Sequence, residues 1–229
     1  MRERLVAVPT ERMHLWLMLV LTFTTGINDA VGYLGLDKVF TGNMTGNVVV
    51  LGMALVGGSG LPILGPALAL VGFMLGAALG GRTLRRGNRS WHGLTTVVFA
   101  TVAVVLLALG VVLLIVGGAP PKPVRVTVTT TAAFAMGLQA AAARLIAVKD
   151  VTTVVVTSTI TGLAADLGSG KWDGAARRAS AVVAIIAGAA AGAALLKWHL
   201  GTGLLVAGVV IALATCVGDL HDRGQRVDR

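Results

Sequence analysis

The chain of 229 residues is too hydrophobic and too poor in charge to be an ordinary soluble domain. Hydrophobic side chains make up 55% of it and charged side chains 13%, whereas soluble proteins carry about 25% charged residues. The net charge of +9 does not indicate nucleic-acid binding, because the basic residues lie in short clusters between apolar runs, where they orient membrane proteins. We therefore expect the lipid bilayer as a partner and no nucleic acid.

Eight apolar segments follow one another along the chain, four in each half. A membrane-spanning helix needs about 20 apolar residues, and most of these runs approach or exceed that length. In chain order they cover residues 13–35, 41–57, 61–81 and 93–118, and then 124–147, 151–168, 178–196 and 199–218. The predicted regions are a tail 1–12, a first membrane repeat 13–118, a Pro/Gly linker 119–123, a second membrane repeat 124–218 and a polar, frayed tail 219–229.

The segments 41–57 and 151–168 are the shortest or most polar. If all eight segments cross the membrane, 11 Lys and Arg residues lie on the side of the N-terminus and 8 on the other side. If these two segments return to the side from which they entered, 15 lie on the side of the N-terminus and 4 on the other. Cytoplasmic loops are enriched in Lys and Arg, so the second topology is favoured. We predict an all-α membrane protein of the bacterial inner membrane, with about six transmembrane helices, two short re-entrant or broken helices and both termini cytoplasmic.

The two halves of the chain repeat each other. Shifts of 111 to 116 residues superimpose matching positions, namely Gly26 on Gly137, Asn28 on Gln139, Thr45 on Thr157, Gly72 on Gly188 and Gly76 on Gly192. Each half then has three crossings, and repeats with an odd number of crossings insert in opposite orientations. We therefore predict an internal inverted repeat, as in many transporters.

Two polar residues lie inside the first segment, Asn28 and Asp29. A carboxylate near the middle of a membrane helix costs about 2.5–3.5 kcal/mol on insertion scales, so it should face protein or water and is a candidate binding group. The alternative is that Asp29 is hydrated near the interface or pairs with Lys38. The second half has Gln139 in the place of Asn28 but Ala140 in the place of Asp29, so Asp29 would act alone, with proton coupling if it titrates.

The string Thr41-Gly-Asn-Met-Thr-Gly-Asn47 opens the second segment. Asn and Thr cap helix starts, and a helix that begins inside the bilayer directs unpaired N–H groups at the membrane centre, where they suit an anion or a carbonyl group. Asn43, Thr45 and Asn47 are therefore candidate solute-binding residues. Alternatively, Gly42 and Gly46 form a small-residue face for helix packing, and the two roles are compatible.

The segment 151–168 carries a polar face in the second half. Its threonines include Thr157 and Thr159, and Thr157 lies four residues from both Thr153 and Thr161 on one helical face. Thr157 and Thr159 are candidates for a polar path opposite Thr45 and Asn47. Threonines in membrane helices also often bond their own backbone, and the sequence leaves both readings open.

Other residue patterns indicate packing rather than chemistry. Small-residue stripes that allow close helix approach are predicted at Gly72, Gly76, Gly80, Gly188 and Gly192. The four histidines lie at segment ends without metal-ligand spacing, and no nucleophile or phosphate-binding motif is present. We expect no catalytic residues, no metal and no cofactor. All four tryptophans fall near segment ends, as in an interfacial belt.

The elements Gly26-Ile-Asn-Asp-Ala30 and Phe40-x-x-Asn43-Met-Thr-Gly-Asn47 resemble the YoaK-type (DUF1275-like) family of uncharacterised bacterial membrane proteins. The family's second half has a Gly-x-Gln element, an Arg and a Thr-rich segment, which here are Gly137, Gln139, Arg144 and the threonines up to Thr161. The likeness covers about residues 14 to 215. It implies a small multi-pass membrane protein and carries no established activity.

The function that the sequence favours is passage of a small polar or anionic solute through a site at the membrane midplane, by a channel or a carrier. One alternative is a non-transporting membrane scaffold or assembly protein. Another is an intramembrane enzyme, which would need Ser158 or Asp29 beside a suitable base. The sequence leaves a homo-oligomer open.

Overall fold

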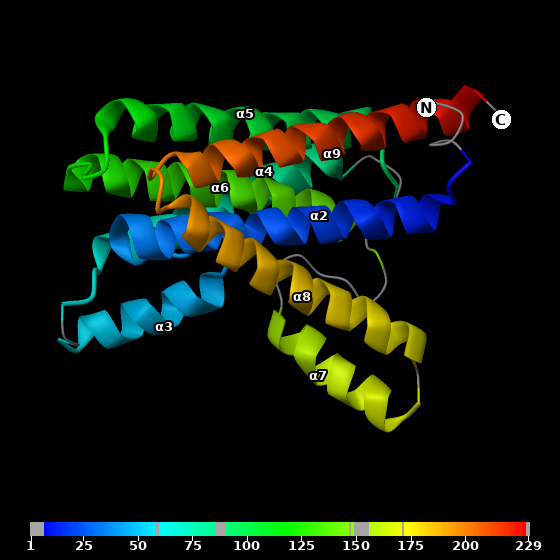
Figure 1. Ribbon diagram of the computed structural model, residues 1–229, viewed down its shortest axis with the longest axis horizontal. Helices are drawn as coiled ribbons and strands as arrows, with labels where there is room; N and C mark the ends of the chain where they lie inside the picture. Colours follow the sequence, from blue (N-terminus) through cyan, green and yellow to red (C-terminus); the bar gives the residue numbers. More distant parts are fainter. Residues whose placement is uncertain are drawn as a thin grey trace.

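The structure is a computed structural model that describes residues 7–57, 60–85, 90–146, 148, 156–170 and 172–227. This part of the chain is helical with short connections and contains no strand. Figure 1 labels the elements, which are α2 (Thr10–Ala30), the π-helix η1 (Val31–Asp37), α3 (Met44–Leu55), α4 (Leu64–Leu84), α5 (Gly93–Val116), α6 (Lys122–Ile146), α7 (Val156–Gly168), α8 (Trp172–Leu195) and α9 (Thr202–Val227).

Within the described residues, six helices are long and apolar enough to cross a membrane, namely α2 with η1, α4, α5, α6, α8 and α9. The helices α3 and α7 have 12 and 13 residues, which at about 1.5 Å per residue is well short of a hydrocarbon core of about 30 Å. This confirms the predicted all-α architecture of six spanning helices and two short ones. The predicted threonines Thr152 and Thr153 lie outside the described residues.

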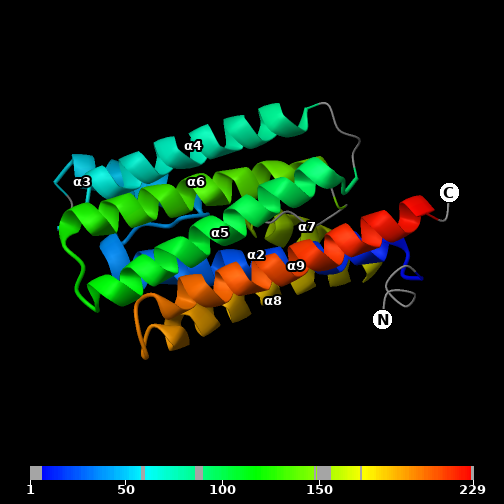
Figure 2. The ribbon, with the colours of Figure 1, turned by 90° about the horizontal axis from the view of Figure 1, so that it is seen from above.

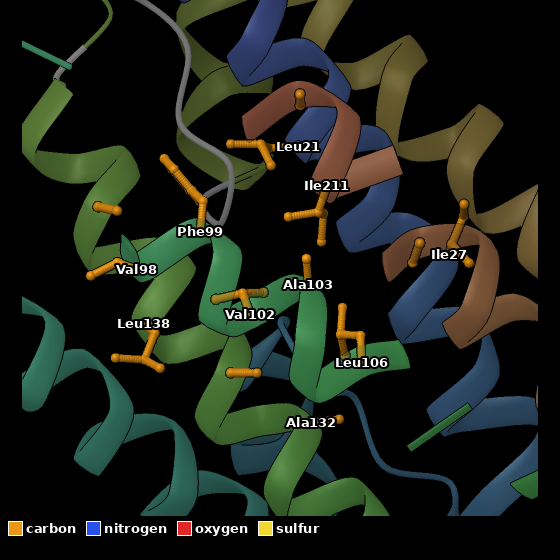
Figure 3. Close-up of a cluster of buried hydrophobic side chains, with 14 of the residues drawn as sticks. Leu21, Ile27, Val98, Phe99, Val102, Ala103, Leu106, Ala132, Leu138 and Ile211 are labelled. Atoms are coloured by element: carbon orange, nitrogen blue, oxygen red, sulfur yellow. The ribbon is translucent and has the colours of Figure 1, made fainter. Parts of the chain in front are cut away.

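Helices α2, α5, α6 and α9 form the centre of the bundle. Helix α4 packs on α6 and helix α8 packs on α2, while the short helices lie outermost, α3 on α4 and α7 on α8 (Figures 1 and 2). Figure 3 shows part of the core, to which α5 contributes Phe99 and Leu106, α2 contributes Leu21 and α9 contributes Ile211. The packing of the α-helices in the first half is thus repeated in the second half.

Equivalent helices run in opposite directions. In Figure 1 the chain traverses α2 from right to left and α6 from left to right, and α4 and α5 are opposed in the same way to α8 and α9. The start of α2 and the end of α9 lie at one end of the bundle, which we call the terminal end. Helix α3 runs toward the opposite end and α7 toward the terminal end (Figure 1).

The crossing of α4 and α6 depends on glycine. A Cβ atom at Gly76 would overlap the backbone carbonyl oxygen of Phe134, and a Cβ atom at Gly137 would overlap that of Phe73. Any larger residue would force the two helices apart, because backbone cannot move aside as a side chain can. Gly80 completes the contact, since its Cβ would lie 2.9 Å from the Ala141 Cβ.

The crossing of α2 and α8 has the same geometry. A Cβ atom at Gly188 would overlap the carbonyl oxygen of Phe23, and one at Gly192 would lie 3.0 Å from the Ala30 Cβ. Phe23 and Ala30 precede Phe134 and Ala141 by 111 residues, so Gly188 corresponds to Gly76 and Gly192 to Gly80. The equivalence therefore follows a shift of 112 residues here, and not the shift of 116 that the glycine spacing suggested.

The C-terminal region differs from its prediction. Helix α9 continues through Gly218 to Val227, whereas a frayed tail was expected from this glycine onward. The i,i+4 ion pairs Asp219–Arg223 and Asp222–Arg226 support these last turns. Trp91 is buried against Gly218 and stacks on Phe99, so the packing of α9 beside the start of α5 extends past the apolar segment.

Candidate functional site

The loop between η1 and α3 brings the chain back into the bundle. Lys38 adopts a left-handed backbone conformation (φ 51°), which ends the π-helix and reverses the chain, and the Val39 N–H then donates to the Gly32 carbonyl (3.4 Å). Phe40 stacks on Tyr33 of η1 (ring centroids 4.7 Å apart). The loop therefore runs beside η1 and places the start of α3 close to Asp29.

Asp29 is buried and holds this loop. Its Oδ1 accepts hydrogen bonds from the backbone N–H groups of Thr41 (2.9 Å), Gly42 (2.7 Å) and Asn43 (3.4 Å). Glycine is required at position 42, because a Cβ there would lie 2.8 Å from the Thr25 Cγ2. The amides just before α3 are thus bonded to a carboxylate of the protein itself, while the Met44 and Gly46 N–H groups in its first turn donate to the Gly42 carbonyl and the Asn43 side chain.

Two asparagines complete the start of α3. Asn43 is its N-cap, and the Asn43 Oδ1 accepts from the Gly46 N–H (3.2 Å), as is typical of this residue at a helix start. Asn47 is buried and forms two hydrogen bonds with the backbone of Phe40, one from the Phe40 N–H to Oδ1 (2.8 Å) and one from Nδ2 to the Phe40 carbonyl (2.6 Å). A Cβ at Gly46 would lie 2.6 Å from the Phe40 ring, so this glycine also faces the loop.

Asn28 and Gln139 form a reciprocal pair across α2 and α6. The Asn28 Nδ2 donates to the sulfur of Met136 (3.2 Å), and the Gln139 Nε2 donates to the Thr25 hydroxyl (3.3 Å) and the Leu21 carbonyl (3.4 Å). Met136 and Thr25 are themselves separated by 111 residues. Each of the two helices therefore carries a side-chain amide and, one turn earlier, the group that accepts a hydrogen bond from the amide of the other helix.

Both amides retain an unpaired acceptor. Asn28 and Gln139 are 0% and 1% exposed, and Asn28 Oδ1 and Gln139 Oε1 are buried without a hydrogen-bond partner. A buried polar atom that lacks a partner costs about 1–3 kcal/mol, so such atoms need a physical explanation. That two equivalent positions share this state makes the space between α2 and α6 the strongest candidate site in the described chain.

The predicted residues divide into a buried group and an exposed group. Asn28, Asp29, Asn47 and Gln139 are buried inside the bundle, and Thr159 of α7 is buried as well. The exposed residues are Asn43, Thr45 and Thr157. The Thr161 hydroxyl donates to the Thr157 carbonyl (3.0 Å), which is the backbone bonding considered as an alternative for this face.

Sequence reasoning missed Thr25, Met136 and Phe40. Thr25 bonds the Gln139 amide through its hydroxyl and contacts the Gly42 position through its methyl group, so it joins the amide pair to the Asp29 loop. The spacing of 111 residues between Thr25 and Met136 was a usable signal, because both lie three residues before an amide. Nothing in the sequence singled out Phe40 as the partner of Asn47.

The described basic side chains are found toward the helix ends. The Lys and Arg residues that the structure describes lie in connections or within about two turns of a helix end. Besides Arg223 and Arg226 of α9, Arg178 pairs with Asp166 (2.9 Å) and Arg125 pairs with Asp37 (3.8 Å). Among the described residues, no group of three or more His, Cys, Asp or Glu side chains could hold a metal ion.

Six apolar helices around a buried polar centre define a multi-pass membrane protein. The chain belongs to the family described as "Protein of unknown function (DUF1275)", which matches residues 17–217, and this confirms the resemblance seen in the sequence. It is similar to the UPF0700 transmembrane protein YoaK of Bacillus subtilis (strain 168), with 30% identity over 152 residues, or 66% of each chain. No solved structure matches the chain. The relative and the six helices together indicate a bacterial multi-pass membrane protein.

Proposed function

We propose that the protein passes a small polar solute across the bacterial cytoplasmic membrane, as a channel or a carrier, through a midplane site between its two halves. The observation that carries this proposal is the Asn28–Gln139 pair, in which each half supplies one buried amide whose carbonyl oxygen has no partner. Transporters built from repeats place their binding sites at such an interface. On this proposal the protein is not an enzyme and uses no cofactor.

The two halves form an inverted repeat with both termini in the cytoplasm. The opposed directions of α2 and α6 support the inversion (Figure 1), and so do the equivalent glycine contacts at Gly76 and Gly188. Lys and Arg are concentrated at the terminal end of the bundle, and the positive-inside rule assigns that end to the cytoplasm.

A polar solute is favoured over an anion. The backbone amides of Thr41, Gly42 and Asn43 donate to the Asp29 carboxylate, and the Met44 and Gly46 amides in the first turn of α3 donate to other groups of the protein. An anion would have to displace that carboxylate from Gly42 and Thr41 while remaining close to its negative charge. The unpaired atoms between α2 and α6 are acceptors, which suit a solute that donates hydrogen bonds or carries positive charge.

Solute entry into proteoliposomes tests the proposal. The purified full chain is reconstituted, and light scattering follows the swelling of the vesicles after mixing with urea, glycerol, methylammonium or formate. At least one solute should enter faster than into protein-free vesicles, and Gln139→Met should slow that solute, because it removes one carbonyl at nearly constant volume. Thr129→Val is the matched control, since it removes a buried hydroxyl that bonds only its own helix.

A non-transporting scaffold is the second candidate function. The close glycine crossings of α4 on α6 and α2 on α8 favour it, because they make these helix pairs rigid. For a scaffold, none of the four solutes would enter faster than into empty vesicles, and Gln139→Met would behave like Thr129→Val.

A further inference from the structure

The orientation of the two central amides is fixed by their surroundings. The sulfur of Met136 and the carbonyl of Leu21 can only accept hydrogen bonds, so the NH₂ groups of Asn28 and Gln139 must point at them. The two carbonyl oxygens therefore face elsewhere, and both are buried without a partner. One comes from α2 and the other from α6, and each amide bonds a residue that lies one turn before the other amide in its helix.

The charged side chain next to this pair in the sequence is acidic. Asp29 follows Asn28 directly in α2 and is 8% exposed. The backbone amides that donate to its Oδ1 compensate its negative charge only partly, because amides are dipoles and not cations. The described Lys and Arg residues lie near the ends of the elements. A ligand between α2 and α6 thus meets carbonyl oxygens and a nearby carboxylate but no cationic side chain of the described chain.

We propose that the carbonyl oxygens of Asn28 and Gln139 bind a small monovalent cation, either an alkali ion or an ammonium ion. Carbonyl oxygens replace the hydration shell of such ions inside membranes. A divalent ion is disfavoured, because Ca²⁺ and Mg²⁺ sites usually include carboxylate ligands or retained waters, whereas the two ligands here are uncharged amide carbonyls. The site is the one in the proposed function, on which this inference rests, and it names the class of solute.

The site joins the two halves of the molecule. One ligand comes from residues before the linker and the other from residues after it, so any displacement of one half against the other changes the distance between the two oxygens. Thr25 connects the pair to the loop that Asp29 holds, because it bonds Gln139 and contacts Gly42. Occupation of the site and the position of this loop are therefore mechanically linked.

Thermal stability in a cation series tests the binding. The purified full chain in detergent is heated in chloride salts of N-methylglucamine, sodium, potassium and ammonium at constant ionic strength. A ligand that binds only the folded state raises Tm with its concentration, so at least one small cation should raise Tm above its value in N-methylglucamine. Exchange of chloride for gluconate at constant cation should leave Tm unchanged. The salt with the largest effect separates an alkali ion from ammonium.

The variants assign the effect to the pair. Asn28→Leu with Gln139→Met should abolish the rise in Tm, whereas Thr129→Val should keep it. If the double variant does not fold, Gln139→Met alone should raise the half-maximal cation concentration about tenfold or more, as expected for the loss of one bond to a charged group. Equal Tm in all four salts, or an unchanged cation response in the variants, would overturn the proposal.

The cation series and the vesicle assay can fail independently. If a cation raises Tm but no solute enters the proteoliposomes, the binding site stands and the proposed function falls. If urea or glycerol enters through the protein while no cation changes Tm, the proposed function stands and the cation site falls. A water molecule as the sole occupant predicts this absence of any cation response.

Discussion

Replacing Gly76 by alanine should separate the close crossing of α4 and α6. The added Cβ would overlap the Phe134 carbonyl oxygen and would lie 2.9 Å from the Phe134 carbonyl carbon and 3.2 Å from the Leu138 nitrogen. All three atoms are backbone, so the helices themselves must move. Overpacking of this kind costs about 1–3 kcal/mol, and it outweighs the gain of about 0.8–1.0 kcal/mol that alanine gives over glycine in a helix.

Gly81 of the same helix provides the matched control. It is exposed, and nothing lies within 4 Å of a Cβ placed there, so Gly81→Ala should gain stability through helix propensity alone. The helix-propensity gain is common to both variants, so they should differ by the overpacking cost alone, about 1–3 kcal/mol in their free energy of unfolding. Unfolding in mixed micelles of mild detergent and SDS, followed by circular dichroism, measures this difference. Equal stabilities for Gly76→Ala and Gly81→Ala would refute the reasoning.

Three further predictions follow from contacts described above. Gly188→Ala should lose about as much stability as Gly76→Ala in the same assay, since its Cβ would overlap the Phe23 carbonyl oxygen; a neutral effect would contradict the equivalence of the two crossings. Asn47→Leu should destabilise by about 2–4 kcal/mol, because it leaves two backbone groups of Phe40 unpaired, whereas exposed Asn43→Ala should cost about 1 kcal/mol as a lost N-cap. Asp29→Asn should remove the pH dependence of solute entry into proteoliposomes while keeping a carbonyl for the loop amides; unchanged pH dependence would exclude Asp29 from proton coupling.

The sequence predicted the number and order of the helices well, because the bilayer imposes a length on every spanning segment. Helix α5 covers Gly93–Val116, close to the predicted run 93–118. Helix α8 begins at Trp172, six residues before the predicted segment, since its first turns are polar and apolar composition does not mark them. Helix α9 was cut at Gly218 because glycine and charge usually end a helix, whereas tertiary contacts with Trp91 override that preference here.

The candidate site was predicted by residue type more reliably than by role. Asn28 and Gln139 were found through the 111-residue spacing, and their pairing with Met136 and Thr25 follows from the same spacing. For Asp29 and Asn47, the sequence indicated polarity at depth but not the partner, because both bond the backbone of the loop. Backbone partners leave no trace in side-chain patterns.

Asp29 also makes the two halves unequal. Its counterpart in the second half is Ala140, so a carboxylate that binds three amides on one side corresponds to a methyl group on the other. In an alternating-access protein with identical inverted halves, the outward-open and inward-open conformations would be related by a two-fold rotation about an axis in the membrane plane and equal in energy. A carboxylate in only one half makes the two conformations differ in energy, so the resting protein would favour one of them. The side chain at position 140 would then determine the size of this energy difference.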